Sequence, residues 1–338
     1  MVPRSASVRG VGGYLPPRMV GNDEFAARLD TSDEWIRSHL GIRSRRIAEK
    51  ESTSDLAVKA GNCALESAGT GVDSLVLATT TPDHPVPASA PAVAARLGLG
   101  PVAAFDLNSA CSSFVYALAV SASMIVAGLA ERVLVIGADT ATTLIDPADR
   151  LTSVIFGDGA GAVVLEAGDA ADAGAVGPFV LGSDGGRGDL LVVPGGGSRQ
   201  RKDLVPPQDG PFLRMEGRGV FDGAVAGMSA TVGKVAAQAG WRPGDIDRLA
   251  CHQANQRIID AVGARLGLPP DRLLSNIEHV GNTSAASVPL LLAESSRRGR
   301  LAEGQRVVLA AFGAGLAWGA AALRWPGVRA VTEGVADG

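Results

Sequence analysis

The sequence predicts an α/β protein assembled from two similar halves. Along its 338 residues, segments typical of buried strands alternate with helical segments, which is the pattern of layered α/β proteins with partly parallel sheets. An eight-residue segment at 92–99 recurs at 261–268 with seven identities, and the offset, 261 − 92 = 169, is half the chain length. We therefore expect one α/β unit over residues 1–172 and a second, pseudo-symmetric unit over residues 173–338.

Hydrophobic periodicity and capping signals predict the elements in order. Strands are expected at 7–12, 73–80, 105–107, 131–137, 247–250, 307–312 and 318–325, and a glycine-rich turn at 156–161 leads into another strand. A helix capped by Thr31 or Ser32 begins the helical segments, which continue at 54–68, 88–97, 112–128, 220–239, 254–266 and 283–295. In both halves an Asp-x-Leu strand start precedes the repeated segment, and a glycine-rich turn into an apolar strand follows it.

Composition and charge argue against several classes of protein. The net charge is −4 and no basic run occurs, so nucleic-acid binding is not expected. Three widely separated cysteines indicate a reduced, cytoplasmic setting and no disulfide framework. The polar first residues do not form a signal peptide, and no apolar run reaches the ~18 residues that span a membrane. His84 and His279 lack partners at metal-ligand spacing, so no metal site is expected.

Cys111 stands where a buried strand gives way to a packed helix. The strand ends near Leu107, a short turn follows, and apolar residues then continue at helical spacing to Gly128. Free backbone N–H groups and the positive end of the helix dipole favour thiolate over thiol at such a turn. A thiolate there is a nucleophile on a rigid scaffold, and a buried structural cysteine is the competing interpretation.

The second half supplies polar side chains at the ends of its elements. His252 ends a predicted strand, and Asn282 begins the helix expected at 283–295. A thiolate could attack while a neutral His and an Asn donate hydrogen bonds to a developing oxyanion. Singly, these residues could be a strand-end histidine and a helix cap. At equivalent ends of a repeat they predict a thiol active site, with the Cys111 turn facing segment 281–284.

Seven motifs occur in one order along nearly the whole chain. They are 33–36 (DEWI), 41–47 (GIRSRRI), 110–112 (ACS), 156–162 (FGDGAGA), 252–258 (HQANQRI), 281–284 (GNTS) and 312–319 (FGAGLAWG). From about residue 7 to residue 325, the chain therefore resembles the β-ketoacyl-acyl carrier protein synthase III family of the thiolase-like superfamily. The resemblance implies a thiolase-like fold in α/β/α/β/α layers, and a homodimer.

The resemblance also implies a decarboxylative Claisen condensation. Cys111 takes the acyl group of a short acyl-CoA primer as a thioester, and CoA leaves. Malonyl-acyl carrier protein then loses CO2, and the resulting enolate attacks the acyl-cysteine. His252 and Asn282 would stabilise the charge that decarboxylation develops on the thioester oxygen. Acyl-CoA is a substrate in this scheme, and no permanently bound cofactor is expected.

Other site residues follow from the resemblance. The backbone N–H of Cys111 and one from the loop Gly313, Ala314 and Gly315 would form an oxyanion hole, since small residues let the backbone approach substrate. Phe312 would lie over the cysteine as a gate.

The resemblance also implies which residues form part of the entrance for coenzyme A. Trp35 would stack on adenine. Arg150, before an expected strand at 151–153, would pair with the nucleotide phosphate or ring. Asn255 and Arg257 would line the entrance. The family often has an arginine where His39 stands, so Arg37 is the candidate substitute. Candidates to dock an acidic carrier protein are Arg37, Arg43, Arg45, Arg46, Arg214, Arg218 and Arg257.

Val86 departs from the family pattern. The family commonly places a bulky aromatic residue there, which crosses the dimer interface into the partner's acyl pocket. A smaller side chain leaves room for primers beyond acetyl, such as propionyl or short branched chains. With the Ala-, Gly- and Arg-rich composition, this favours priming of an aromatic polyketide over initiation of fatty acids, which uses the same chemistry.

Two alternatives remain open beside condensation. One is a same-fold acyltransferase that passes the acyl group from CoA to an alcohol or amine without decarboxylation. The other is a silent ketosynthase partner subunit, against which the intact Cys111, His252 and Asn282 speak. A thiolase would need a second cysteine near the C-terminal glycine loop, and residues 311–319 contain none. Segment 157–161 (GDGAG) lacks G-x-G-x-x-G spacing, which argues against nucleotide binding there.

Overall fold

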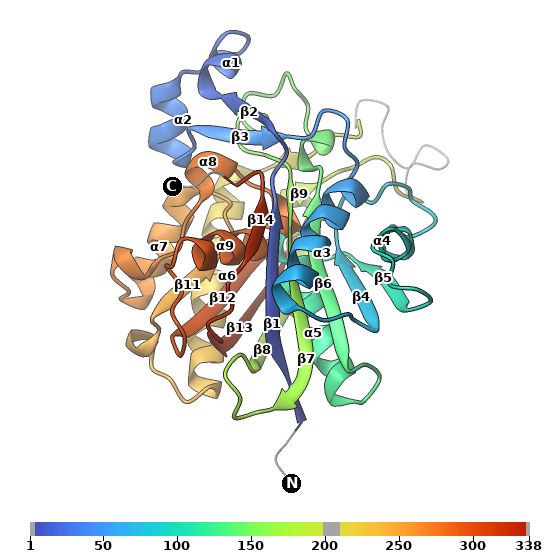
Figure 1. The fold of residues 1–338 in the computed structure, drawn as a ribbon. Coiled ribbons are helices and arrows are strands. Elements are labelled where there is room, and N and C mark those ends of the chain that lie inside the picture. The colour runs from blue at the N-terminus through green and yellow to red at the C-terminus, as the bar shows by residue number, and fades with distance from the viewer. Residues whose placement is uncertain (1–3, 199–209, 336–338) are drawn as a thin grey trace.

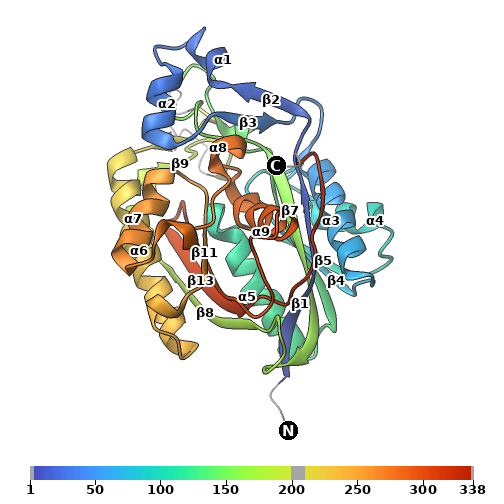
Figure 2. The same cartoon turned by 60° about the vertical axis from the view of Figure 1, so that its left-hand side comes forward.

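The elements of the protein stack in five layers of helix, sheet, helix, sheet and helix (Figure 1). The computed structural model describes residues 4–198 and 210–335. A view turned by 60° shows two central helices, α5 (Ser113–Val126) and α9 (Ser287–Arg297), beside the strands of both sheets (Figure 2). The predicted α/β class and its layered arrangement are confirmed.

The two main sheets share one order of pairing. The first contains β14 (Val331–Glu333), β1 (Arg4–Tyr14), β7 (Gly159–Asp169), β6 (Arg132–Asp139), β4 (Ser74–Ala78) and β5 (Ala103–Leu107), in that order. The second contains β8 (Val176–Ser183), β13 (Ala317–Arg324), β12 (Arg306–Gly313) and β11 (Arg248–Cys251). In the first sheet, β1 with β7 and β7 with β6 pair antiparallel, and β6 with β4 pairs parallel. In the second sheet, β8 with β13 and β13 with β12 pair antiparallel, and β12 with β11 pairs parallel. This repetition supports our division into halves near residue 172, which stays a proposal.

Alternation of side chains along each strand builds three layers of core. Leu75 and Leu77 of β4 pack with α3 (Thr53–Ala68) and α4 (Ala90–Arg96) on the outer face. Val76, between them, joins the central core with α5 and α9. In the second sheet, Val308 packs with the outer helices α6 (Gly217–Gln238) and α7 (Gln256–Leu266), whereas Leu309 belongs to the central core. Because both faces are covered, the strands read as nearly continuous apolar runs.

A small cap covers one end of the sheets (Figure 1). It consists of the antiparallel strands β2 (Arg18–Gly21) and β3 (Ser44–Ile47) with the helices α1 (Asn22–Ala26) and α2 (Asp33–Leu40). Ser32 caps α2, since its Oγ accepts a hydrogen bond from the Trp35 N–H at 3.1 Å. Smaller elements are β9 (Leu191–Val192), which pairs with β10 (Arg214–Met215), and α8 (Ile277–Val280).

Several segments differ from the sequence predictions. The helices predicted at 112–128 and 283–295 each begin with a separate 3₁₀ turn, η1 (Ala110–Ser112) and η7 (Ser284–Ala286). Residues 151–153, predicted as a strand, form a turn. Asp149 stabilises that turn by accepting hydrogen bonds from Leu151 N at 2.9 Å and from Thr152 Oγ1 at 2.6 Å. The pairing of β14 with β1, which returns the end of the chain to the first sheet, was not anticipated.

Candidate active site

Cys111 lies in η1, between β5 and α5, as the sequence predicted. Ala110 before it has φ 48°, and Ser284 in the second half has φ 50°, a region that residues other than glycine seldom adopt. These two positions are equivalent in the repeat, because 284 − 110 = 174 is also the offset between the starts of α5 and α9, 287 − 113. Cys111 Sγ lies 3.7 Å from Ser284 Oγ. The two turns therefore meet at the thiol.

Burial dominates the chemistry of this thiol. Cys111 keeps some surface exposure, yet burial of its sulfur raises the thiol pKa to about 12. The Ser284 hydroxyl acts against this rise in pKa, and the nearby Asp139 carboxylate adds to it. The prediction that the turn favours thiolate is therefore wrong for the resting chain, in which the thiol is neutral.

Asn282 is fixed by its backbone and by its side chain. Its N–H donates to Ile155 O at 2.9 Å, and its carbonyl accepts from Gly157 N at 3.0 Å. Its side-chain Oδ1 accepts from Ser284 N at 2.9 Å. With Oδ1 engaged, the amide N–H₂ is the part of the side chain that can donate to a substrate oxygen.

His252 follows β11, and its backbone N–H donates to Ala310 O of the neighbouring strand β12 at 2.7 Å. The residue is 2% exposed. Burial lowers its imidazole pKa to about 4, so the ring is neutral at neutral pH. Among the described residues, Nδ1 is buried without a hydrogen-bond partner. A neutral ring held in this way suits the predicted donor.

The glycine loop after β12 approaches the nucleophile closely. A Cβ placed on Gly313 would lie 2.7 Å from the Cys111 backbone N, so only glycine fits. Backbone hydrogen bonds in both directions between Asp184 and Leu316 hold the loop, at 2.8 and 3.0 Å. Gly315 has φ 134°. The contact supports the predicted pairing of the Cys111 N–H with loop 313–315, and Ala314 lies within this loop.

The ring of Phe312 packs on the side of the second sheet that carries α6. It stacks with Trp318 at a centroid distance of 6.3 Å. Cβ atoms placed on Gly223 and Gly227 of α6 would lie 3.1 and 3.3 Å from the ring. The ring belongs to the core that the outer helices α6 and α7 cover, and its gating role stays a prediction.

The predicted coenzyme A residues separate into two groups. The Arg150 guanidinium lies over the Trp35 ring at 5.4 Å, and His39 stacks on the same ring at 4.6 Å. Arg37 instead pairs with Asp33 at 3.3 Å. It lines a surface hollow of about 500 Å³ together with the acidic residues Asp33, Glu34 and Glu278. The structure thus brings Arg150 and His39 to Trp35, and does not bring Arg37 there.

The remaining predicted positions lie at α7 and in the loop before α4. Asn255 caps α7, with its Oδ1 accepting from Arg257 N at 2.9 Å. Arg257 is exposed. Gly41, at the end of α2, packs closely against the side chain of Gln256, so the end of α2 adjoins the start of α7. Val86 is 84% exposed, and it therefore does not line a pocket of its own chain.

Sequence reasoning missed three residues that organise the site and gave a wrong role to a fourth. Ser284 contacts the Cys111 thiol through its hydroxyl, and the charge of Asp139 acts on that thiol. Gln253 is fully buried and joins the segment after His252 to residues 275–277, its Oε1 accepting from Asn276 N at 3.0 Å. Arg45 was predicted to dock a carrier protein, which is wrong, because its side chain is fully buried and donates to Asn22 Oδ1 at 2.7 Å. Ser284, Gln253 and Arg45 lie within three of the seven sequence motifs, which could have drawn attention to them. Asp139 lies in none of these motifs.

The structure also bears on what else the chain could bind. Within residues 4–198 and 210–335, no cluster of three His, Cys, Asp or Glu side chains could hold a metal ion. No helix in those ranges is long and apolar enough to cross a membrane. Cys63 and Cys251 are buried and form no disulfide.

The fold and site define a thiolase-like condensing enzyme of the acyltransferase type. Family profiles described as 3-oxoacyl-[acyl-carrier-protein] synthase III and as its C-terminal part match residues 105–185 and 236–325. The chain belongs to the β-ketoacyl-acyl carrier protein synthase III family, as its motifs predicted.

Known relatives match the chain over nearly its whole length. β-Ketoacyl-[acyl-carrier-protein] synthase III 5 of Streptomyces coelicolor is 52% identical over 95% of this chain and 98% of its own. The crystal structure of FabH, 3-oxoacyl-(acyl carrier protein) synthase III of Pseudomonas aeruginosa, superposes with a TM-score of 0.91 at 50% identity, covering 96% and 99% of the chains. The priming β-ketosynthase of the R1128 polyketide pathway has a TM-score of 0.90 at 38% identity, covering 96% and 97%.

Proposed function

We propose that the protein condenses a short acyl-CoA primer with malonyl-acyl carrier protein through an acyl-Cys111 intermediate. The observation that carries this proposal is the meeting of two turns at the thiol. Ser284 lies 3.7 Å from Cys111 Sγ and hydrogen-bonds Asn282 through its backbone. The names of the relatives support acyl carrier protein as the carrier of one substrate.

Acyl transfer opens the reaction. The Cys111 sulfur attacks the thioester carbon of acyl-CoA, a new sulfur–carbon bond forms, and the bond between that carbon and the CoA sulfur breaks. The thiol proton of Cys111 ends on the departing CoA sulfur. During attack, negative charge gathers on the thioester oxygen. The Cys111 N–H, beside Gly313, would donate to that oxygen.

Decarboxylation follows. The malonyl group loses CO2, and the electron pair of the broken bond forms an enolate whose oxygen accepts from His252 and Asn282. The enolate carbon then attacks the acyl-Cys111 carbonyl, and the bond between that carbon and the Cys111 sulfur breaks. The cysteine leaves as thiolate, and a proton from solvent restores the neutral thiol. Neutral donors suit this step. His252 is neutral because burial lowers its pKa to about 4, and the Asn282 Oδ1 is already occupied. The scheme uses acyl-CoA as substrate and needs no resident cofactor.

Intact mass spectrometry tests the first half of the reaction. Incubation with acyl-CoA is expected to add the mass of one acyl group to the wild type and none to Cys111→Ala. Release of CO2 from malonyl-carrier protein, dependent on His252 and Asn282, tests the second half. Loading without CO2 release would favour the alternative acyltransferase that uses an alcohol or amine. Absence of loading would favour the silent subunit.

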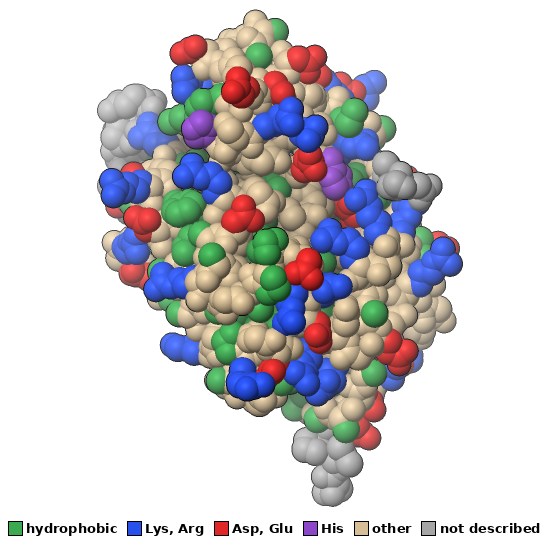
Figure 3. Space-filling model, turned by 90° about the vertical axis from the view of Figure 1, so that its left-hand side faces the viewer, with side chains coloured by type: hydrophobic (Ala, Val, Ile, Leu, Met, Phe, Trp, Pro, Cys, Tyr) green, Lys and Arg blue, Asp and Glu red, His purple; other side chains and the backbone are tan. Residues whose placement is uncertain are grey.

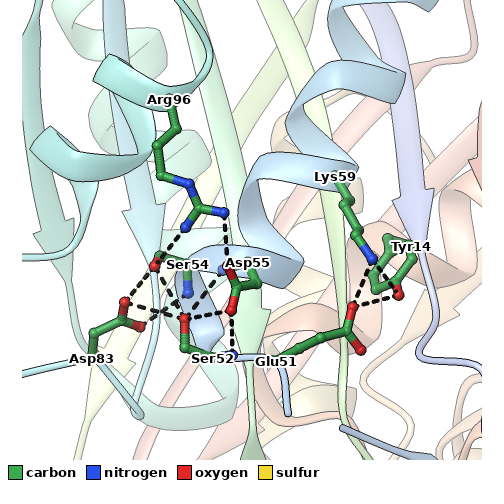
Figure 4. A network of polar contacts seen from close by, with 8 residues as sticks. All are labelled: Tyr14, Glu51, Ser52, Ser54, Asp55, Lys59, Asp83 and Arg96. Carbon is green, nitrogen blue, oxygen red and sulfur yellow. Dashed lines mark hydrogen bonds and ion pairs between the residues drawn. The ribbon is translucent and has the colours of Figure 1, made fainter.

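The position of Val86 supports a homodimer that completes the acyl pocket. The loop carrying this exposed side chain is anchored at both ends. Asp83 Oδ1 accepts from Ser54 N at 3.0 Å, within the polar network at the start of α3 (Figure 4). At the other end, Ser89 N donates to Asp106 Oδ2 at 2.8 Å. A fixed loop that presents an apolar tip to solvent suits insertion into a second copy of the chain.

Carrier docking would use arginines on the surface around the coenzyme A residues. Basic side chains lie among acidic ones on the face that Figure 3 shows. All four of these arginines are exposed, but Arg37 pairs with Asp33 and Arg43 pairs with Glu278. Arg218 and Arg257 form no ion pair among the described residues. We therefore assign the docking role to Arg218 and Arg257. It would act by attraction of an acidic partner, which raises the association rate.

We further propose that the product enters polyketide synthesis and that the protein acts in the cytoplasm. The priming ketosynthase among the similar structures supports polyketide initiation. Relatives whose names give an acyl carrier protein and no pathway leave fatty-acid initiation as the second candidate. A panel of acyl-CoA primers, scored by kcat/KM with fatty-acid and polyketide carriers, separates the two. Preference for acetyl-CoA and the fatty-acid carrier would overturn the polyketide assignment.

A further inference from the structure

The hydroxyl of Ser284 touches the reacting sulfur, and nothing in the reaction described above uses it. Ser284 Oγ lies 3.7 Å from Cys111 Sγ. The residue is 5% exposed and has φ 50°, a conformation that is strained in a residue with a side chain. Its N–H is bound to Asn282 Oδ1 at 2.9 Å. The fold therefore holds this hydroxyl between the nucleophile and a proposed oxyanion donor.

A chain of hydroxyl groups leads from Ser284 to a buried carboxylate. Ser284 Oγ lies 3.5 Å from Thr80 Oγ1, which donates to Asp139 Oδ1 at 2.9 Å. Asp139 is fully buried, and its other oxygen accepts from Ala285 N at 2.9 Å. An ionised carboxylate only accepts hydrogen bonds, so the Thr80 proton points to Asp139. The Ser284 proton is then free to point either to Thr80 or to the sulfur.

We propose that Ser284 is a further catalytic residue, whose hydroxyl accepts a hydrogen bond from the Cys111 thiol and donates one to the Cys111 thiolate. Rotation about a single C–O bond converts one arrangement into the other, with no movement of heavier atoms. The inference rests on the proposed role of Cys111 as nucleophile.

The same hydrogen bond serves both halves of the reaction. Cys111 becomes a thiolate when it attacks acyl-CoA, and again when the condensed product leaves it. Hydrogen bonds that meet a charged partner are stronger than neutral ones, so the hydroxyl favours the ionised sulfur over the thiol. It thereby offsets part of the cost of placing a negative sulfur near Asp139.

The charged and titratable groups around the sulfur come from two further elements. Asp139 ends β6, and it opposes ionisation of the thiol. His252 follows β11, next to the strand that carries Gly313, and it is neutral above pH of about 4 because burial lowers its pKa. Neither group supplies a positive charge to the thiolate at neutral pH. The Ser284 hydroxyl and the backbone N–H groups of the turn are the donors that remain.

Alkylation of Cys111 by iodoacetamide, followed from pH 7 to 10, tests this inference. The label is located by peptide mass spectrometry, with Cys111→Ala as the blank. Alkylation in Ser284→Ala is expected to be about tenfold slower at each pH, because loss of a donor to the thiolate displaces the profile by about one pH unit. Single-turnover acyl loading from acyl-CoA should slow by a similar factor.

Two further variants make the result decisive. Ser284→Gly, which relaxes the positive φ and also lacks the hydroxyl, should show the same displacement. Thr283→Val is the matched control, since Thr283 is buried beside Ser284 and its hydroxyl has no partner among the described residues. Its profile should coincide with that of the wild type.

The outcome separates this inference from the proposed function. If wild type and Ser284→Gly load acyl groups on Cys111 with the same pH profile, Ser284 is not catalytic and the condensation mechanism stands. If wild type loads no acyl group on Cys111, the proposed function itself fails, whatever the alkylation profiles show. If Thr283→Val shifts the profile as Ser284→Ala does, the effect comes from packing of the turn and the inference is overturned.

Discussion

At the residue scale, the imidazole of His252 links the chemistry of the site to stability. Burial lowers its pKa to about 4, from an ordinary value of 6.5. Between these two pH values the unfolded chain binds a proton that the folded chain does not. The contribution of His252 to the free energy of unfolding is therefore complete above pH 6.5 and is lost as the pH falls towards 4. The shift corresponds to about 3 kcal/mol over the whole window.

We predict that His252→Gln removes this pH dependence. Between pH 7.5 and pH 5, urea unfolding of the wild type should lose about 2 kcal/mol more stability than the variant loses. Comparing the two proteins cancels opposing groups such as Asp158, whose pKa burial raises to about 6. Equal losses in the two proteins would show that folding does not lower the pKa of His252.

Trp35 offers a second test at this scale, because Arg150 and His39 both contact its ring, which is only partly buried. Stacking of a base on an aromatic ring contributes about 1–3 kcal/mol. Trp35→Ala should therefore raise the KM for acyl-CoA about tenfold, with kcat little changed, while Trp35→Phe should retain most of the affinity. An acyl-pantetheine substrate, which lacks the nucleotide, is the control. If its KM rises equally, Trp35 does not bind adenine.

At the scale of elements, two facing glycines bring α9 onto the first sheet. Gly137 of β6 and Gly161 of β7 are partners in the ladder. A Cβ on Gly137 would lie 2.4 Å from Ala285 O, and one on Gly161 would lie 2.5 Å from Leu290 N. The backbone of η7 and α9 thus rests directly on the strands. This close approach sets the position of Ser284, and of Asn282 just before it.

Gly161→Ala is therefore expected to shift α9 and to destabilise the protein by about 1–3 kcal/mol. It should also reduce acyl loading on Cys111, because η7 moves with the helix. Gly233→Ala in α6 is the control, since a Cβ there meets nothing within 4 Å and helix propensity favours alanine by about 1 kcal/mol. Chemical denaturation measures both effects. A stability of Gly161→Ala equal to that of the wild type would mean that α9 does not depend on this contact.

At the scale of the whole molecule, the sequence predicted the layers better than it predicted the connections between them. Buried strands and amphipathic helices have strong periodic signals, so the elements, the repeat and the meeting of the Cys111 and 281–284 turns could be inferred. Asp139 could not, because its role depends on a long-range hydrogen bond to Ala285 N. The neutral state of the Cys111 thiol could not be inferred either, since desolvation depends on what the whole fold places around the sulfur.

We expect the second copy of the proposed homodimer to bind at the outer edge of the first sheet. Within the described part of the chain, β5 pairs with β4 alone, and its other side forms the edge of the sheet. An edge strand with unpaired backbone groups can pair with another chain. Phe105 and Leu107 of this strand are only partly buried. The Val86 loop is tied to the same strand through Asp106, which accepts from Ser89 N and from Ala90 N.

These positions predict that one contact couples assembly to primer choice. Phe105→Lys, which puts a charge on the edge strand, should shift the protein from dimer to monomer in analytical ultracentrifugation and slow acyl loading.

Val86→Phe should leave the dimer intact and fill the acyl pocket of the partner. It should lower kcat/KM for branched primers by about tenfold or more relative to acetyl-CoA, since each methylene excluded from a pocket changes binding by about 1–3 kcal/mol. Ala88→Ser, another exposed position of the same loop, is the control and should retain the wild-type primer ratio. A monomeric wild type, or an unchanged primer ratio in Val86→Phe, would show that each acyl pocket is completed within a single chain.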